Sequence, residues 1–337
     1  MKQAMLNLMM AGGVFAPFRL ANRGKAVILT YHRFGEDDIG SKTSARLFAD
    51  QLEYLCRYYN IVPLSTIANC LVKHQEIPDY SVAITIDDGY GDAYEIAYPL
   101  LKRFGVPATL FVVTDFVDGK DWIWTDKLRF LALQTGTREV ELTIGNRKLR
   151  LGGIERKNRL IAAGKVNEAL KQISNAAKEE AINGFSEAFG LELPDQAPEG
   201  FEAINWEQAR EMSANGIEIG SHTVTHPILT QVDDDKLLRE MGESKTRIEN
   251  ELKREAGLFC YPNGDYDSRV QLAVENAGYL CAVTTRHGFN DSNCHPLALG
   301  RIDAERDLAH FVQSTSGFEQ VKNRLRRTRF NTVGVET

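Results

Sequence analysis

Short apolar runs alternate with amphipathic stretches along most of the chain. The runs are rich in Val, Ile, Leu and Ala, which is typical of strands buried on both faces. Between them, apolar residues recur every third or fourth position, as in residues 48–59 and 93–104, which predicts helices. The expected strands lie at residues 26–32, 61–62, 81–86, 108–113, 217–219, 258–261, 280–284 and 297–302. The alternation predicts right-handed βαβ units and a parallel sheet, closed or nearly closed into a (β/α) barrel.

The pattern changes in the middle of the chain, between residues 118 and 199. Residues 140–144 and 148–151 are strand-like and flank Gly145 and Asn146, which predicts a hairpin. A polar, helix-rich stretch follows at residues 155–189. The expected organisation is an N-terminal helical segment (1–25), a barrel in two parts (26–117 and 200–315), an inserted subdomain (118–199) and a basic C-terminal tail (316–337).

Composition describes an ordinary soluble protein of one large domain or two, with 337 residues, 43% apolar content and a formal net charge of −6. A mildly acidic chain lacks the broad basic surface that nucleic acid requires, so no nucleic-acid partner is expected. The charged helix at residues 235–255 is expected to be a solvated outer layer. The five cysteines have no paired spacing, which favours a reducing compartment and a cytoplasmic location.

The N-terminal residues 1–20 have the outline of a weak signal peptide. Asn7 interrupts the apolar run, and Pro17 follows without a clear cleavage site, so a helix that packs on the domain is preferred. The run is also too short to span a bilayer. Peripheral contact with a membrane surface through residues 1–20 stays open as an alternative.

Candidate chemistry lies where two of the expected strands end. Asp87 and Asp88 follow one buried strand, and His222 and His226 follow another. In α/β proteins, ligands bind at the carboxyl ends of parallel strands. Two imidazoles four positions apart can face one ion, and two His with one carboxylate form a usual ligand set for catalytic zinc. Taken separately, the aspartates are ordinary turn residues and the His pair could arise by chance.

These two motifs resemble those of the polysaccharide deacetylases of carbohydrate esterase family 4, which share the chitooligosaccharide deacetylase homology domain. The first motif is at residues 85–89 and the second at residues 221–226, and the resemblance covers roughly residues 26–120 and 200–310. It implies a distorted (β/α) barrel of about seven strands. It also implies that a divalent metal is held by three residues, Asp88, His222 and His226, and that Asp87 is the catalytic base. Zn2+ is the expected ion, with Co2+, Mn2+ or Ni2+ as alternatives.

The chain departs from the family pattern in its third motif. Many members have Arg-x-Pro-Tyr where this chain has Cys260, Tyr261, Pro262 and Asn263. The arginine that usually orients the base is therefore missing, and Arg301 at another strand end is the expected substitute. Cys260 is expected to be a small buried hydrophobe. The resemblance implies that Tyr261, Pro262 and Asn263 line the substrate site and that the backbone N–H of Asn263 helps to form an oxyanion hole.

The histidine of the fifth family motif is also missing, because residues 297–301 contain none. Another group must then protonate the leaving amine. His32 is the expected general acid, since it ends the first strand and a Tyr-His pair there looks like a branch of the family that acts on exported poly-N-acetylglucosamine. His287 and His295 are the alternatives.

The expected function is a metal-dependent hydrolase that removes N-acetyl groups from an N-acetylated sugar or polysaccharide, such as an exopolysaccharide. Trp122 and Trp124 could stack on a sugar ring or form a hydrophobic seam. Three alternatives stay open: hydrolysis of another carbon–nitrogen bond, such as a formyl amide or a cyclic ureide; a non-catalytic glycan-binding protein; and a structural zinc site.

Overall fold

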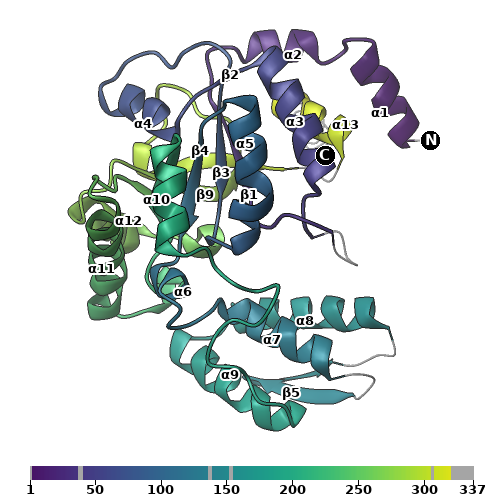
Figure 1. Cartoon of the computed structure of the whole chain (residues 1–337), viewed down its shortest axis with the longest axis vertical. Coiled ribbons are helices and arrows are strands. Elements are labelled where there is room, and N and C mark those ends of the chain that lie inside the picture. Colours follow the sequence, from purple (N-terminus) through teal and green to yellow (C-terminus); the bar gives the residue numbers. More distant parts are fainter. Residues whose placement is uncertain (1, 37–40, 136–138, 152–154, 305–306, 320–337) are drawn as a thin grey trace, which may run out of the picture.

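A computed structural model describes residues 2–36, 41–135, 139–151, 155–304 and 307–319. Seven parallel strands close into a barrel with helices outside it, which confirms the expected distorted (β/α) barrel (Figure 1). The order around the barrel is β1 (Val27–Tyr31), β10 (Leu299–Asp303), β9 (Cys281–His287), β8 (Leu258–Cys260), β7 (Ile217–Ser221), β4 (Ala108–Val112) and β3 (Ser81–Ile86), which pairs again with β1.

An eighth strand, β2 (Asn60–Ile61), joins the sheet without entering the ring. It pairs with the first two residues of β3, whereas β4 pairs with the last two, Thr85 and Ile86. Because β1 runs along the other edge of β3, β2 and β4 share one edge of this strand. The barrel is therefore distorted at β3, the strand that precedes the two aspartates.

The barrel strands are buried along their whole length in β1, β3 and β4, as the apolar runs predict. Successive residues face opposite sides of the sheet. Ile28 belongs to the cluster that fills the barrel, and its neighbour Leu29 belongs to the cluster between barrel and helices. Helix α4 (Leu64–Val72) contributes Ile67 and Leu71 to the same cluster as Ile28, so this helix packs against the side chains that fill the barrel.

The outer layer consists mainly of helices that follow the strands in sequence. They are α3 (Ala45–Tyr58), α5 (Tyr98–Phe104), α6 (Thr114–Val117), α10 (Trp206–Ala214), α11 (Asp234–Leu252), α12 (Ser268–Asn276) and α13 (Leu308–Ser316). The helix expected at residues 93–104 is interrupted: a π-helical turn, η1 (Ala93–Ala97), precedes α5. Pro99 has no N–H to donate, so it suits the first turn of a new helix better than the middle of a long one.

The middle of the chain forms a separate layer below the barrel in Figure 1. It contains α7 (Trp124–Gln134), the antiparallel hairpin β5 (Val140–Ile144) and β6 (Arg147–Leu151), α8 (Arg156–Leu170) and α9 (Asn175–Phe189). These elements share their own apolar cluster, which includes Leu128, Leu142, Leu170 and Phe185. Because this cluster is formed within the middle of the chain, it supports the proposal that residues 118–199 are an insertion.

The N-terminal segment is helical, with α1 (Lys2–Ala11) and α2 (Ala16–Ala21). Leu6 and Phe15 are buried against Ala309 and Val312 of α13. Among the described residues, no helix combines the length and apolarity needed to cross a bilayer. Most of the expected basic tail, residues 320–337, lies outside the described residues.

Candidate functional site

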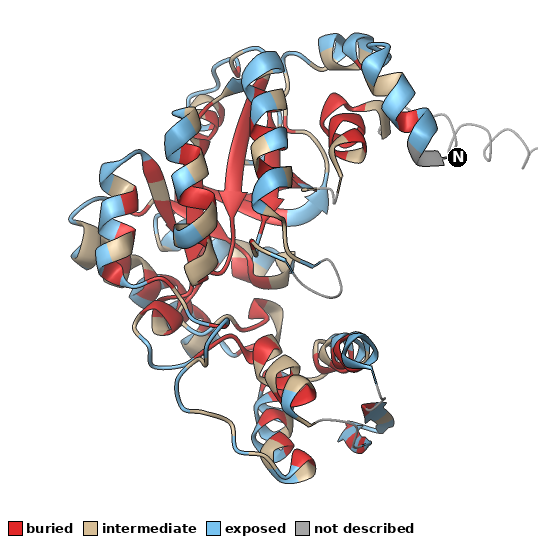
Figure 2. Cartoon of the chain, turned by 45° about the vertical axis from the view of Figure 1, so that its right-hand side comes forward, coloured by how far each residue is buried: buried red, intermediate tan, exposed pale blue. Residues whose placement is uncertain are grey.

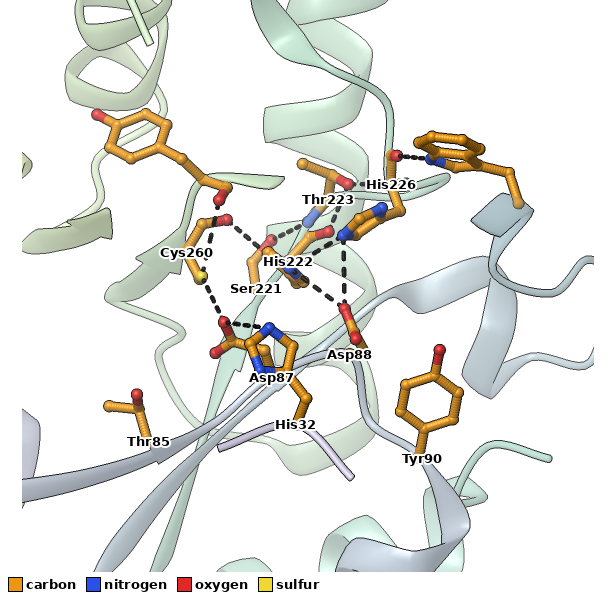
Figure 3. A network of polar contacts seen from close by, with 12 residues as sticks. His32, Thr85, Asp87, Asp88, Tyr90, Ser221, His222, Thr223, His226 and Cys260 are labelled. Carbon is orange, nitrogen blue, oxygen red and sulfur yellow. Dashed lines mark hydrogen bonds and ion pairs between the residues drawn. The ribbon is translucent and has the colours of Figure 1, made fainter. Parts of the chain in front are cut away.

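The two aspartates turn to different partners as the chain leaves β3. The N–H of Asp87 donates to the carbonyl of Tyr31 at 2.9 Å and so continues the ladder with β1. Asp88 then adopts φ 75° and Gly89 φ 83°, which bends the chain sharply. Positive φ is unfavourable for Asp and free for Gly, so the turn stores strain at the strand end. As a result the adjacent carboxylates face separate groups (Figure 3).

Asp88, His222 and His226 come together at the carboxyl ends of β3 and β7 (Figure 3). The Nε2 atoms of the two imidazoles are 3.2 Å apart, and each lies 3.4 Å from Oδ1 of Asp88. A tetrahedral zinc ion with bonds of about 2.0–2.1 Å would hold its donor atoms roughly 3.3 Å apart. The three residues therefore fit a divalent ion, in number, type and spacing.

Hydrogen bonding orients one of the two imidazoles. Nδ1 of His222 donates to the carbonyl of Cys260 at 2.7 Å, which turns Nε2 toward Asp88. Metal-binding histidines usually make such a bond with their second nitrogen. Nδ1 of His226 is buried and finds no partner among the described residues. His226 is therefore the less well supported of the two rings.

Burial and neighbouring charges set the ionisation of these groups. Burial and the nearby His222 lower the pKa of His226 to about 3, so this ring is neutral. Burial also opposes charge on His222, but its contacts with Cys260 and Asp88 outweigh burial and raise its pKa well above the usual value. Burial alone would raise the pKa of Asp88, but the hydrogen bond with His222 and the positive charge of that ring outweigh burial and hold the pKa below the usual range. Loading an ion would then release the proton of His222.

The loop that carries both histidines is held by Glu240 of α11. Its carboxylate accepts from the N–H groups of Val224 at 2.8 Å and Thr225 at 3.0 Å. Within the loop, Thr223 has φ 74° and His226 φ 56°, which are strained conformations for these residues. Glu240 is only 3% exposed, so the expectation that α11 is simply a solvated outer layer is wrong for this face. The buried positions of α11 recur every three or four residues, and that spacing was the available signal.

Asp87 makes a bidentate ion pair with Arg301. Two guanidinium nitrogens lie 2.8 Å from the two carboxylate oxygens, and both side chains are 2% exposed. Burial alone would raise the pKa of Asp87, but the charge and hydrogen bonds of Arg301 lower it overall. Arg301 also donates to Thr85 and to the carbonyl of Thr284, which holds the guanidinium in place. The arginine expected to replace the missing family residue therefore contacts the expected base directly.

The Cys260 side chain fills the space beside this ion pair. It is fully buried, and its sulfur lies 3.5 Å from Oδ2 of Asp87 and 3.3 Å from Nη2 of Arg301. Burial raises the pKa of the thiol, so it stays neutral. The prediction of a small buried hydrophobe describes the side chain but missed its carbonyl, which orients His222.

Nε2 of His32 lies 3.7 Å from Oδ2 of Asp87. Its ring is half exposed, whereas Asp87 is buried, so His32 stands between the carboxylate and solvent. The alternative histidines, His287 and His295, are exposed and do not line the pocket that holds Asp87. Of the three histidines considered as general acid, His32 is the one beside the base.

These groups surround a pocket of about 220 Å³. Its walls include Asp87, Asp88, both loop histidines, His32 and Arg301, together with Trp124, Lys171, Tyr261, Pro262, Asn263 and Thr285. Tyr261 is fully buried and its hydroxyl donates to the carbonyl of Leu297, so its ring supports the wall. Asn263 adopts φ 58° at the bend that follows. Lys171, at the end of α8, is a wall residue that the sequence pattern did not suggest.

The two tryptophans lie in different surroundings. Trp122 is 3% exposed, packs with Phe130 and Phe201, and donates from its indole N–H to the carbonyl of Pro194. It belongs to a hydrophobic seam. The indole N–H of Trp124 donates to the carbonyl of His226 at 3.2 Å, while its ring lines the pocket. The start of α7 thus contacts the histidine loop.

The sequence around both motifs has counterparts in a known protein family. A sequence model of the family described as polysaccharide deacetylase matches residues 74–146 and 157–282, which include both motifs. The chain belongs to the polysaccharide deacetylase family. The family assigns it to hydrolases that act on glycans. The match runs through much of the expected insertion, and it does not include residues 26–73.

Three individual deacetylases share only 19–23% sequence identity with the chain. The putative polysaccharide deacetylase YxkH of Bacillus subtilis (strain 168) is 23% identical over 283 residues, which are 82% of this chain and 71% of that protein. The structure of Streptococcus pyogenes deacetylase PplD in complex with acetate superposes with a TM-score of 0.59 at 19% identity, covering 87% of this chain and 99% of that one. IcaB from Ammonifex degensii gives 0.57 at 19%, covering 87% and 97%. At these identities, the two structures support the fold alone.

Proposed function

We propose that the protein is a metal-dependent deacetylase that hydrolyses the N-acetyl groups of an N-acetylated glycan. The observation that carries this proposal is the division of labour between adjacent carboxylates. Asp88 joins two imidazoles in a set of donors 3.2–3.4 Å apart, whereas Asp87 is held 2.8 Å from Arg301, outside that set. A ligand carboxylate beside a second, ionised carboxylate is what metal-assisted hydrolysis needs.

A divalent ion, most simply Zn2+, would be held by Asp88, His222 and His226. When bound, it supplies Lewis acidity, which lowers the pKa of a water molecule toward about 7 and polarises the acetyl carbonyl. Three protein ligands leave a position open, which is typical of a catalytic rather than a structural zinc site.

The surrounding residues handle the protons. Asp87, kept ionised by Arg301, accepts a proton from the attacking water, whose oxygen adds to the acetyl carbon. The backbone N–H of Asn263 donates to the oxyanion that develops on the carbonyl oxygen. His32, at the solvent side of Asp87, donates a proton to the sugar nitrogen as the C–N bond breaks. Acetate and a free amino sugar are released.

We also propose that the protein is located in the cytoplasm, on the basis of its cysteines. All five cysteines lie in the described part of the chain and are free thiols, as expected in a reducing cytoplasm.

Acetate release from a panel of N-acetylated oligosaccharides and polysaccharides tests the function. We expect release by the purified full chain, its loss after treatment with a chelator, and its return when Zn2+ is added. Mass spectrometry of the metal content should show one ion per chain. Formate release or ureide cleavage without acetate release would favour another carbon–nitrogen bond. Glycan binding by the metal-loaded protein without any hydrolysis would overturn the enzymatic proposal.

A further inference from the structure

The backbone that carries His32 is held on both sides of this residue. Before it, the carbonyl of Tyr31 accepts from the N–H of Asp87 at 2.9 Å. Tyr31 ends β1, which is buried along its length, like most of the barrel strands coloured red in Figure 2. After it, Phe34 is fully buried, and its N–H donates to Oδ1 of Asp92 at 3.1 Å. Both contacts tie the loop to the chain that leaves β3.

Arg33, the residue after His32, is held from three directions. Its Nε donates to Oδ2 of Asp92 at 2.7 Å, and its Nη2 donates to the carbonyl of Gly200 at 2.7 Å. The guanidinium carbon lies 3.9 Å from the centre of the Tyr90 ring. The side chains of Arg33 and Asp92 are each only 10% exposed, so water screens this ion pair little. The guanidinium therefore has one well-defined position.

Asp92 uses both of its carboxylate oxygens on this loop. Oδ2 accepts from the side chain of Arg33, and Oδ1 accepts from the backbone of Phe34. Lys42 adds a second cation 3.5 Å from Oδ2. Neither Arg33 nor Asp92 is among the described residues that line the pocket of Asp87. The pair therefore acts on the pocket only through the loop that it holds.

The ring of His32 has little else to fix it. Its Nε2 is 3.7 Å from Oδ2 of Asp87, which is longer than a hydrogen bond, and the ring is half exposed. Its place beside Asp87 therefore depends on its backbone. A general acid must come within hydrogen-bond distance of the atom that it protonates, and a displacement of about 1 Å can lower the rate about a hundredfold.

We propose that Arg33 and Asp92 are positioning residues that hold His32 where it protonates the leaving amine. This inference rests on the proposed function, in which His32 is the general acid. The contacts of Asp88, His222 and His226 with one another involve neither residue of the pair. Weakening the pair should therefore slow the proton transfer and leave the bound metal in place.

Asp92→Asn tests the proposal, because asparagine keeps the shape of the side chain but has one acceptor oxygen and no charge. We expect kcat for acetate release to fall about tenfold, with unchanged KM and metal content. The same change is then made in the His32→Ala variant. Without the imidazole there is no acid to misplace, so Asp92→Asn should change kcat there by less than about twofold.

The matched control is Asp118→Asn. Asp118 is 7% exposed and accepts from Arg247 at 2.8 Å, so this variant also weakens a shielded ion pair with an arginine. Its partners, Arg247 and Trp206, do not belong to the loop of His32. We expect Asp118→Asn to leave kcat unchanged. Thermal unfolding of both variants shows whether they lose similar stability.

Amide hydrogen exchange tests the pair without relying on activity. Asp92→Asn weakens the bond that protects the N–H of Phe34, so exchange in residues 31–36 should become at least about tenfold faster. Exchange in the histidine loop, residues 221–226, should not change. If Asp92→Asn does not fold, Arg33→Lys, which keeps the charge but loses the planar fork, is measured in the same experiments.

Four results would overturn the inference. They are an unchanged kcat in Asp92→Asn; an equal fall in kcat with and without His32; a fall in Asp118→Asn as large as in Asp92→Asn; and unchanged exchange in residues 31–36. If the unchanged chain releases no acetate, the proposed function fails, and the catalytic role of the pair fails with it. Unchanged exchange beside normal acetate release removes the positioning role alone.

Discussion

Asp87 and Asp88 are neighbours in sequence, but the positive φ of Asp88 separates their surroundings. Asp88 faces two imidazoles and has no arginine partner among the described residues, whereas Asp87 is neutralised by Arg301. A carboxylate already held by a bidentate guanidinium has little to offer an ion, but it stays ionised and so can accept a proton. Two adjacent aspartates are therefore expected to have different roles, Asp88 as a metal ligand and Asp87 as a proton acceptor.

Replacing Asp87 and His222 separates these roles. We expect Asp87→Asn to lower turnover by at least about a thousandfold while the metal stays bound, because the variant keeps its shape but loses the proton acceptor. His222→Ala should lose metal and activity together, since it removes one of three ligands. Metal content and acetate release of both purified variants check this. Equal loss of metal in both would mean that the two aspartates are assigned the wrong way round.

His32 should affect the rate without affecting the metal. Its Nε2 is 3.7 Å from Asp87 and it is not among the clustered ligand atoms. We expect His32→Ala to lower turnover by about a hundredfold or more, with unchanged metal content, because general acid catalysis typically contributes that much. Single-turnover acetate release measures the effect. Unaltered turnover would move the acid role away from His32.

Sequence alone could identify the residues that stand at the ends of recognisable strands. Asp87, Asp88, His222 and His226 follow such strands and form familiar motifs, so their meeting was predictable. The partner of Asp87 could be named only as a hypothesis, since Arg301 lies 214 residues further on and its direction depends on barrel closure. Glu240 was missed because a carboxylate on a charged helix is usually exposed, although it lies on the stripe of α11 that the three-or-four-residue spacing marks as buried.

Helix α11 has a functional face because Glu240 accepts from two backbone N–H groups of the histidine loop. Both N–H groups donate to Oε2, and the hydroxyl of Thr225 donates to Oε1. Glu240→Gln keeps only one acceptor oxygen and removes the negative charge, so the hydrogen bonds that hold the loop become fewer and weaker. We expect metal affinity to fall about 10–100-fold, as for other changes behind metal ligands. Competition with a chelator measures it. Glu243→Gln, on the exposed side of α11, is the control and should leave affinity unchanged.

Helix α9 places a buried cation over α7. Lys178 is 2% exposed, its ammonium lies 4.6 Å from the centre of the Trp124 ring, and burial lowers its pKa to about 8. The folded protein therefore disfavours the charge that the unfolded chain keeps up to about pH 10.4. This penalty is full below pH 8 and shrinks as the pH rises, so stability should increase between about pH 8 and 10 on account of this group.

Lys178→Met should remove that pH dependence. We expect the variant to be about 2 kcal/mol more stable than the unchanged chain at pH 7, after allowing for the lost cation–π contact, and the difference to diminish toward pH 10. Denaturant unfolding at several pH values measures it. Lys165→Met on the exposed side of α8 should change stability little at any pH. A Lys178 variant that is less stable at pH 7 would show that the cation is favourable where it lies.

Most elements follow from the apolar pattern, and the exceptions have local causes. The hairpin of β5 and β6 was predictable because its strands alternate and its turn holds Gly145 and Asn146. The π-helical turn before α5 was not, since the apolar stripe continues across it and only Pro99 hints at a break. A short strand was expected at residues 61–62, and β2 lies at Asn60–Ile61, but its pairing beside β4 results from the distortion of the barrel and could not be predicted from two residues.

The molecule has two main packing centres, the barrel and the middle segment, joined by a small seam. The middle segment has its own cluster with Leu170 fully buried, and the barrel has its clusters with Leu110 fully buried. The seam between them contains Trp122, Ile123 and Phe201. Parts of a protein that have separate hydrophobic cores and a small interface can unfold separately, and hydrogen exchange detects this. If the proposed insertion is such a unit, it should open more easily than the barrel.

Leu170→Ala and Leu110→Ala form a matched pair for this test, because both remove the same buried atoms from a fully buried site. Each is expected to destabilise its own core by about 2–5 kcal/mol. We expect Leu170→Ala to speed amide exchange across α8, α9 and the hairpin while the barrel strands keep their protection, as measured by mass spectrometry of peptides. Leu110→Ala should speed exchange in the barrel strands. If Leu170→Ala speeds exchange equally in β1, β3 and β4, the two cores unfold as one, and residues 118–199 are not an independent insertion.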